Sequence, residues 1–432
     1  METLTENKIE NEAESSYRDV FRNKEFVKLL SGQLFSNVGD AVFRISIVLY
    51  VYSITGSAAQ MTFVLAAQTL PWILVGPISG VLADRISRKT IMVIADFIRA
   101  VSIIAIPFIS TFYILLIIAF IDGVGSSSFS APRSAAIPEM VGLKLYVKAI
   151  SISRLIFQTL AVLGPLMAAP IYAFFGPPAF WITTGCYIIS GMIILITKIP
   201  SASRKEERLT ARIIFRDLGE GLSFLFRQRI IRVLLILFTF VVIGSAFAGP
   251  LIYPWIFEIR HGGNLALEQI ANIEYGIVGA VVALGTVIGN ILFAKFERRI
   301  GRNRAIISGV VALAVYYMIF IFTPPIYVIG IFGFISGIML GMHSLSINAY
   351  FAEEVPNEIR GRAYSATNAY IQVFSVACLS LSGLTSEAIG IANTMLMASG
   401  ILLLGIILLS VKTRLFNFTN IKTETIASLP GD

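Results

Sequence analysis

Residues 80–89, Gly80-Val-Leu-Ala-Asp84-Arg85-Ile-Ser-Arg88-Lys89, form a short charged connection between two long apolar runs. The run before it covers 61–83 and the run after it covers 90–110. A helix of about 20 apolar residues, at a rise of about 1.5 Å per residue, crosses the hydrocarbon core of a bilayer, so both runs are predicted to span a membrane. The connection is too short to hold a soluble domain. It therefore lies at one membrane face, and its three cations mark that face as cytoplasmic.

The composition of the whole chain supports a membrane protein. The 432 residues are 56% hydrophobic and 14% charged, with a mean hydropathy of +0.80. A water-soluble protein could not bury so much apolar surface, so the lipid bilayer is the predicted solvent for most of the chain. Cys186 and Cys378 lie inside apolar runs and offer neither a disulfide framework nor a metal set.

Twelve apolar runs predict an all-α membrane protein with twelve transmembrane helices in two six-helix halves. The expected spans are 26–53, 61–83, 90–110, 112–131, 149–174, 178–199, 230–257, 272–294, 305–322, 326–349, 364–388 and 392–411. The expected domains are an N-terminal tail at 1–25, a six-helix bundle at 26–200, a linker at 201–229, a second six-helix bundle at 230–412 and a C-terminal tail at 413–432.

The distribution of cations predicts the orientation in the membrane. All but three of the 34 Lys and Arg residues fall in the two tails, in the even-numbered connections between spans, or within five residues of the span ends that adjoin them. Arg44 and Arg99 lie inside spans, and Arg260 lies on the opposite side. Because cytoplasmic loops carry the excess of Lys and Arg, both tails and the linker are predicted to be cytoplasmic, in a multi-pass protein of the cell membrane. The same bias explains the net charge of +8 without a nucleic-acid partner.

An internal repeat links the two halves. The segment 85–88, Arg-Ile-Ser-Arg, returns as Arg-Ile-Gly-Arg at 299–302, an offset of 214 residues. Ile137-Pro138 returns in similar form as Val355-Pro356, an offset of 218 residues. Near-equal offsets predict two halves with their helices in the same order. Parallel halves of this kind, with a binding site near the membrane midplane, are typical of alternating-access transporters.

Residues 80–89 resemble a signature of the major facilitator superfamily. In that signature, the loop between the second and third helices has Gly, Asp and Arg at the positions of Gly80, Asp84 and Arg85. Within the superfamily, the chain resembles the branch of macrolide efflux proteins and the enterobactin exporter. The segments that carry this closer resemblance are Gly32-Gln33, Ser36 to Asp40, Thr55-Gly56-Ser57, Leu70-Pro71 and Asp96 to Ala100. The resemblance extends over about residues 24–412 and implies a transporter of a small molecule.

The resemblance also implies a cytoplasmic gate, made of Gly80, Asp84, Arg85, Arg88 and Asp96. The family's loop acid lies near the start of the eleventh helix and keeps the cytoplasmic side closed, so Asp84 is expected to face residues 361–365. Asp96 resembles the buried acid that holds the arginines of the connection. Arg298 stands where the second half would have this acid, so the first connection is expected to be the stronger gate.

Gly164-Pro165, in the fifth expected span, resembles the antiporter signature of drug exporters. Ala168 and Ala169 stand where that signature has paired glycines. Small residues still permit close helix packing, but the incomplete match leaves the direction of transport open.

A polar stripe marks the first expected span. Gln33, Asn37, Asp40 and Arg44 follow one another at spacings of 4, 3 and 4 residues, which places them on one helix face. An ionisable group in mid-membrane is costly and is kept where it faces protein or water. Asp40 and Arg44 are therefore predicted to bind protons or substrate. The alternative is an ion pair between them that only orders the helix bundle.

Asp122 and His343 are two further candidates for proton or substrate coupling. Asp122 lies midway along the fourth expected span and could face Asp40, or could simply bond to neighbouring serines. His343 lies in the tenth expected span. An imidazole titrates near neutral pH, which suits proton coupling, although a plain hydrogen bond would also explain it.

Several absent motifs narrow the function. The chain has no G-x-x-x-x-G-K-[ST], H-E-x-x-H or G-x-S-x-G, and its two histidines cannot supply a metal cluster. An enzyme, an ATP-driven motor and a cofactor are therefore not expected. The prediction is a monomeric secondary transporter that exports a drug, macrolide or siderophore-like compound in exchange for protons. The alternatives are an importer or facilitator of the same fold, or a membrane sensor or scaffold.

Overall fold

Capping residues set the ends of the first helices. The Asn23 side chain accepts hydrogen bonds from the backbone N–H groups of Glu25 and Phe26, which begins helix α3 (Lys24–Thr55). Gly56 ends this helix in the left-handed conformation, with φ of 60°, which glycine adopts without strain. Ser57 then accepts from the Gln60 N–H and begins α4 (Ala58–Leu74). The chain therefore turns back within two residues.

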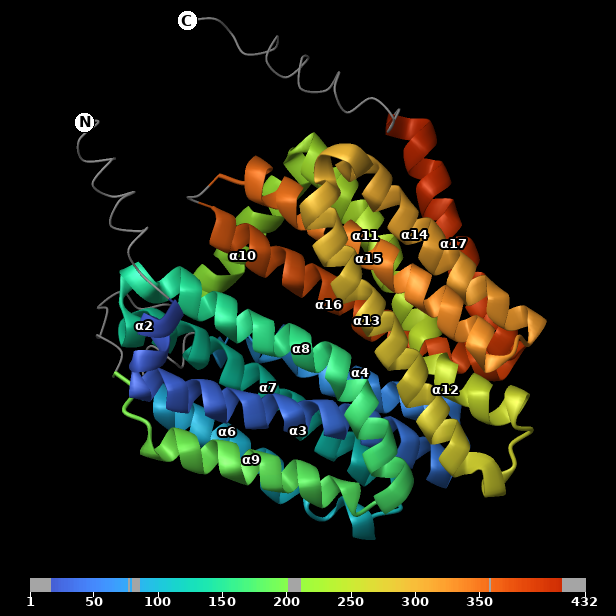
Figure 1. Ribbon diagram of the computed structural model, residues 1–432, viewed down its shortest axis with the longest axis horizontal. Helices are drawn as coiled ribbons and strands as arrows, with labels where there is room; N and C mark the ends of the chain where they lie inside the picture. The colour runs from blue at the N-terminus through green and yellow to red at the C-terminus, as the bar shows by residue number, and fades with distance from the viewer. Residues whose placement is uncertain (1–16, 77, 80–85, 201–210, 357–358, 414–432) are drawn as a thin grey trace, which may run out of the picture. The chain divides into compact units, whose positions relative to one another are not determined.

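The computed structural model describes residues 17–76, 78–79, 86–200, 211–356 and 359–413, and those residues contain helices and no strand (Figure 1). The remaining principal helices are α2 (Tyr17–Arg22), α6 (Arg88–Ile103), α7 (Phe112–Val141), α8 (Leu143–Phe175), α9 (Ala179–Ile196), α10 (Ala211–Arg227), α11 (Arg229–Ala248), α13 (Glu268–Ile300), α14 (Arg302–Met318), α15 (Ile326–Glu354), α16 (Arg360–Ile389) and α17 (Ile391–Thr413). Short turns of 3-10 or π helix extend α6, α11 and α14.

The helices correspond to the twelve predicted spans. Among the described residues, ten helices are long and apolar enough to cross a membrane, and α8 makes an eleventh when its two bent segments count as one span. The shorter apolar helix α4 occupies the place of the second predicted span. The prediction of an all-α, twelve-helix membrane protein is confirmed.

Helix α8 bends by 42° between Leu160 and Leu163. Pro165 lies just after the bend, inside the helix. A proline ring clashes with the carbonyl of the residue four positions earlier and removes one helical hydrogen bond, so the chain bends one turn before it.

The chain divides into two compact units, one formed by residues 1–215 with 266–276 and the other by 216–265 with 277–432. The division near residue 215 falls within the segment expected to be a linker. Residues 201–210 of that segment lie outside the described residues, whereas 211–227 form α10.

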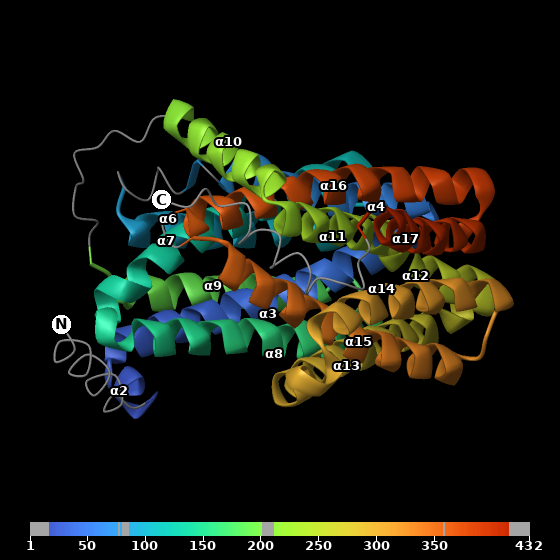
Figure 2. The ribbon, with the colours of Figure 1, turned by 90° about the horizontal axis from the view of Figure 1, so that it is seen from above.

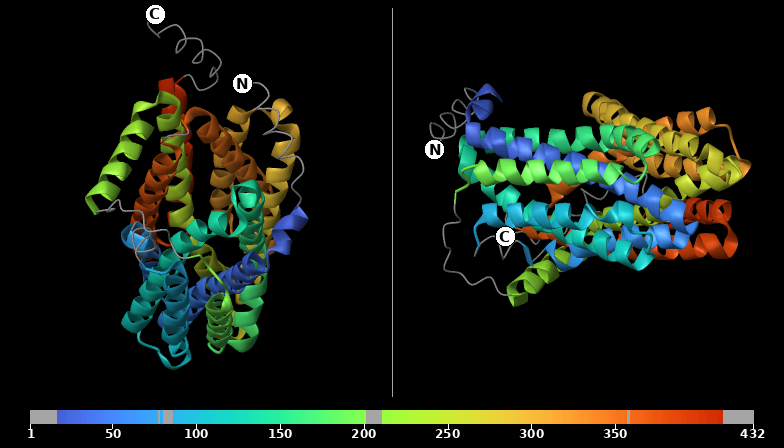
Figure 3. Two further views of the ribbon diagram at one scale, coloured as in Figure 1. Left: turned by 90° about the vertical axis from the view of Figure 1, so that its left-hand side faces the viewer. Right: turned by 90° about the horizontal axis from the view of Figure 1, so that it is seen from below.

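In the first unit, α3 packs against α8, α9 and α4, and α6 packs against α7 and α9 (Figures 1 and 3). One of its apolar cores is formed by buried residues that include Phe26, Leu29, Met92 and Ile194. Helices α4 and α7 lie close together at Gly123, where an added Cβ would lie 2.2 Å from the carbonyl oxygen of Gln68. Small residues thus bring helices near one another in the middle of this unit.

In the second unit, α14 packs against α15 and α17, and α11 packs against α16 and α17 (Figure 2). Glycines also allow α13 to touch α15. A Cβ added at Gly289 would lie 2.0 Å from the carbonyl oxygen of Ile338, and one at Gly341 would lie 2.2 Å from that of Thr286. This contact uses the small residues that helices need for close packing in lipid.

The internal repeat reappears as two matching ion pairs. Arg88, at the start of α6, lies 2.6 Å from Glu139 of α7, and Arg302, at the start of α14, lies 2.6 Å from Glu353 of α15. Both residues of the second pair follow those of the first by 214 positions. Each unit therefore joins equivalent helix ends with the same chemistry.

The two ion pairs differ in burial and in the number of acidic partners. The Arg88 side chain is 7% exposed, whereas Arg302 is 25% exposed and also binds Glu297 at 2.5 Å.

We expect Glu139→Gln to lower the free energy of unfolding by about 1–3 kcal/mol, because it leaves a buried guanidinium without its anion. The matched variant Glu353→Gln should cost less than about 1 kcal/mol. Thermal unfolding of the two purified variants measures the difference, and equal melting temperatures would contradict this account.

Candidate functional site

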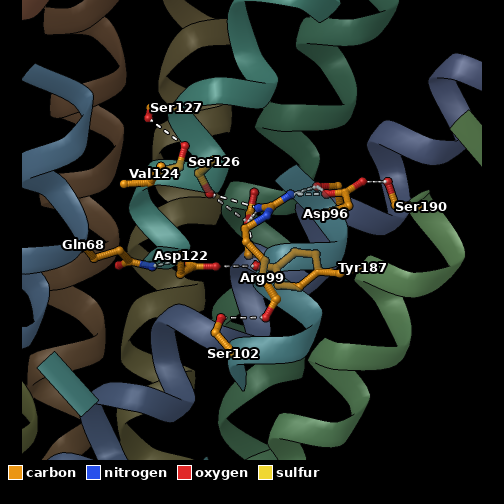
Figure 4. A network of polar contacts seen from close by, with 12 residues as sticks. Gln68, Asp96, Arg99, Ser102, Asp122, Val124, Ser126, Ser127, Tyr187 and Ser190 are labelled. Atoms are coloured by element: carbon orange, nitrogen blue, oxygen red, sulfur yellow. Dashed lines mark hydrogen bonds and ion pairs between the residues drawn. The ribbon is translucent and has the colours of Figure 1, made fainter. Parts of the chain in front are cut away.

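Three carboxylates and one guanidinium meet inside the first unit. Figure 4 labels Asp96, Asp122 and Arg99 among them. Asp40 comes from α3, Asp96 and Arg99 from α6, and Asp122 from α7. Arg99, Asp96 and Asp122 are fully buried, whereas the Asp40 side chain is 39% exposed. Ionisable groups at this depth of a membrane protein mark a functional site by default.

Arg99 is the centre of this acid cluster, by which we mean Asp40, Asp96, Arg99, Asp122 and Tyr187. Its Nη1 donates to Asp40 Oδ1 at 2.7 Å, and its Nη2 donates to Asp96 Oδ1. The face of the Tyr187 ring lies 4.0 Å from the guanidinium carbon, close enough for a cation–π contact. One planar cation therefore holds two carboxylates and an aromatic ring from three helices.

Serine hydroxyls add to the bonding around the guanidinium, whose Nε has no hydrogen-bond partner among the described residues. Arg99 Nη1 donates to Ser126 Oγ at 3.0 Å, and Nη2 donates to Ser36 Oγ at 2.7 Å. Ser190 Oγ donates to the second oxygen of Asp96 at 2.6 Å. Asp96 thus accepts from a cation on one oxygen and a hydroxyl on the other, which stabilises its ionised form without contact with water.

Tyr187 of α9 joins the remaining two carboxylates. Its hydroxyl lies 2.8 Å from Asp40 Oδ1 and 3.1 Å from Asp122 Oδ1. Gln68 of α4 donates from Nε2 to the other oxygen of Asp122 at 2.9 Å. Asp40 and Asp122 therefore lie on either side of one hydroxyl group.

Gly125 makes room for the guanidinium. A Cβ at this position would lie 2.5 Å from both Cγ and Cδ of Arg99, and 3.1 Å from the carbonyl oxygen of Ala95. We expect Gly125→Ala to lower the free energy of unfolding by about 1–3 kcal/mol through overpacking. Gly185→Ala is the control, because nothing lies within 4 Å of its added Cβ and alanine favours a helix by up to about 1 kcal/mol. Thermal unfolding that ranks Gly125→Ala at or above Gly185→Ala would contradict this account.

The four residues of the predicted polar stripe on α3 lie in different surroundings. Arg44 is exposed, and Asp40 pairs with Arg99, so the alternative of an Asp40–Arg44 ion pair is not found among the described residues. Gln33 accepts from Ser153 Oγ of α8 at 2.8 Å. The Asn37 amide nitrogen is buried without a hydrogen-bond partner in the described part of the chain.

His343 lies in the second unit, on α15, and is 1% exposed. Its Nδ1 is 2.8 Å from the carbonyl oxygen of Ile306, and its ring stacks on Phe238 with centroids 6.5 Å apart. Its Nε2 has no hydrogen-bond partner in the part of the molecule that the structure describes. These contacts match the alternative of a hydrogen-bonded histidine, and proton coupling at His343 stays a prediction.

The predicted gate is described only in part. Gly80, Asp84 and Arg85 lie outside the described residues. Asp96 is expected to hold the arginines of the connection, but Arg88 binds Glu139 and Asp96 binds Arg99, so the expectation is corrected for Arg88. Asp96 follows Arg88 by eight residues, or about 12 Å along the helix, whereas Arg99 is its neighbour three residues later.

Gly164, the first residue of the predicted signature on α8, contacts the helix that carries Asp40. A Cβ added to Gly164 would lie 2.9 Å from the Cβ of Ala41. Pro165 follows the bend of α8. Gly164 thus lets α8 lie close to α3, one residue after Asp40.

The sequence reasoning missed Arg99, Tyr187 and Gln68 as members of the site. Arg99 carried a signal, because an intramembrane Arg three residues after an intramembrane Asp predicts an ion pair on one helix face. Tyr187 carried none, since a tyrosine within an apolar run is usually part of the packing. Its role depends on which helices are neighbours.

Two repeated six-helix halves, with a buried ionisable cluster in one of them, define a multi-pass membrane transporter rather than an enzyme. A family profile described as "Transmembrane secretion effector" matches residues 15–431. The chain belongs to this family of major facilitator transporters, whose substrates are small molecules.

Similar proteins include two efflux proteins at low identity. The multidrug efflux pump Tap of Mycolicibacterium fortuitum is 22% identical over 88% of this chain and 93% of its own length. Macrolide efflux protein A of Streptococcus pyogenes is 25% identical over 88% of this chain and 93% of its own length. Among solved structures, the nucleoside transporter NupG superposes with a TM-score of 0.70 over 91% of this chain and 100% of its own, at 13% identity. That likeness concerns the fold alone.

Proposed function

We propose that this protein exports a small organic compound from the cell in exchange for protons, by alternating access. It acts as a monomer in the cell membrane, with both termini in the cytoplasm. The acid cluster supports proton exchange, because its acids outnumber its cation in the membrane interior. Coupling requires that such a group bind a proton with different affinity in the two access states.

The substrate is proposed to be a drug-like or macrolide-like compound. Two similar proteins are a multidrug efflux pump and a macrolide efflux protein, and both align with nearly the whole chain. Asp40 is the exposed acid of the cluster, so it is the member that a substrate or a hydrated proton can reach. The proposed coupling site is therefore the partly exposed Asp40 together with the buried Asp122.

The test measures transport direction with defined probes. Cells that express or lack the protein are exposed to ethidium, erythromycin and a ferric siderophore, and resistance and accumulation are scored. Everted membrane vesicles are then energised with a proton gradient whose acidic side is the vesicle interior. We expect at least one probe to accumulate in the vesicles, and a protonophore to abolish this. Accumulation in energised intact cells would instead show an importer, and no gradient dependence for any transported probe would exclude proton coupling.

A further inference from the structure

The hydroxyl of Tyr187 makes two short contacts but carries one proton. It lies 2.8 Å from an oxygen of Asp40 and 3.1 Å from an oxygen of Asp122. A neutral phenol donates once and accepts on its oxygen. If it donates to one carboxylate, the other contact joins two oxygens with no hydrogen between them unless that second acid is protonated. The geometry therefore favours a proton on Asp40 or Asp122 over two ionised carboxylates.

The partners of the two acids identify which one is protonated. Asp40 Oδ1 also accepts from the guanidinium of Arg99 at 2.7 Å, and a cation stabilises the ionised carboxylate. The hydrogen-bond partners of Asp122 are neutral, namely the amide of Gln68 and the hydroxyl of Tyr187. The proton is thus favoured on Asp122, which donates from Oδ1 to Tyr187, while Oδ2 is the carbonyl oxygen that accepts from Gln68.

The charge balance supports the same assignment. The titratable groups around Asp122 are Asp40 from α3, Arg99 from α6 and Tyr187 from α9, and Asp96 of α6 binds the same guanidinium. Arg133, further along α7, is a second cation whose charge acts on Asp40. With all three carboxylates ionised, the two guanidinium groups would leave one negative charge uncompensated. A proton on Asp122 removes it, and an uncompensated charge within a membrane is costly.

We propose that Asp122 stores the exchanged proton in this conformation and that Tyr187 passes it to Asp40. In the transfer, the Asp122 O–H bond breaks and its proton moves to the phenol oxygen, while the phenol proton moves to Asp40 Oδ1. Tyr187 ends neutral, Asp122 becomes a carboxylate and Asp40 becomes the acid. This step adds a proton pathway to the proposed proton-coupled export, and it rests on that proposed function. Asp40 is the exposed member of the cluster, so it is the one that can release the proton.

Packing holds Tyr187 in place for this transfer. Its ring is fully buried and lies against the guanidinium of Arg99. A Cβ added to Gly39 would lie 2.8 Å from Cε1 of the ring, so α3 lies directly on the ring edge. The hydroxyl of Tyr187 therefore has little freedom to leave the two carboxylates between which it passes the proton.

The location of the proton is tested by infrared spectroscopy of the purified full-length protein at neutral pH, without substrate or gradient. Wild-type protein should show the C=O stretching band of a protonated carboxyl group. Asp122→Asn should remove that band, and Asp96→Asn should retain it. Gln68→Leu is a second variant that keeps Asp122, and it should shift the band by removing the amide that binds the carbonyl oxygen. A full band in Asp122→Asn, its loss in Asp96→Asn, or an unshifted band in Gln68→Leu would each overturn the assignment.

The relay is tested by the rate at which the same band shifts after transfer into D₂O. Tyr187→Phe keeps the ring but removes the hydroxyl, so the band should persist and its exchange should slow by about 10²-fold, the lower range for a lost proton-transfer partner. An unchanged exchange rate would show that Tyr187 is not the relay. Because these readouts need no transport, they can fail while gradient-driven export holds, and they can succeed even if no probe is exported.

Discussion

Asp40→Asn is expected to reduce export in the presence of a proton gradient to the rate seen without one. The amide keeps the size of the side chain and its oxygen can still accept from Arg99, but it cannot bind and release a proton at physiological pH. Since Asp40 is the exposed acid of the cluster, its loss disconnects the buried proton from solution. The measurement is probe accumulation in everted vesicles with and without the gradient.

Asp19→Asn provides the control for this variant. Asp19 lies in α2, before the first span, and pairs with the exposed Arg22. The same chemical change there should leave gradient-driven export at the wild-type rate. Wild-type export by Asp40→Asn would remove Asp40 from the coupling site.

Arg99→Gln is expected to cause the largest loss of stability in the acid cluster. Asp40 and Asp96 would then face each other without the cation that binds both, and Asp96 is fully buried. Removing one partner from a buried ion pair costs about 3–5 kcal/mol, because an uncompensated charge remains. Thermal unfolding in detergent should show a large decrease in melting temperature and lower yield from membranes.

The double variant Arg99→Gln, Asp96→Asn separates charge from packing. It removes the buried anion together with the cation, so it should recover part of the stability lost in Arg99→Gln. A double variant less stable than Arg99→Gln would mean that shape rather than charge sets the cost. A melting temperature of Arg99→Gln equal to that of the wild type would contradict the central place of the guanidinium.

Much of the fold was predictable because its causes are local. The apolar runs are long enough to cross lipid, and the caps Asn23, Gly56 and Ser57 are short-range signals for helix ends. The repeat of Arg88 as Arg302 also lies in the sequence. The bend of α8 was not predicted, although Pro165 gave a reason for it.

The site was less predictable because it depends on which helices touch. Asp40 and Asp122 could be chosen as intramembrane acids, but their link through Tyr187 joins residues 147 and 65 positions apart. Arg44 was chosen for its spacing from Asp40, yet Arg99 of another helix takes that place. The helix period gives the face on which a residue lies, whereas glycines such as Gly39 and Gly125 decide what that face meets.

The most direct test of proton-coupled export measures both fluxes in one preparation. Purified protein is reconstituted into vesicles that contain a trapped pH indicator, and the probe with the largest export rate is added. We predict that wild-type protein moves protons in the direction opposite to the probe, and that Asp40→Asn moves none in response to it. Probe transport by the wild type without proton movement, or equal proton movement by Asp40→Asn, would contradict this account.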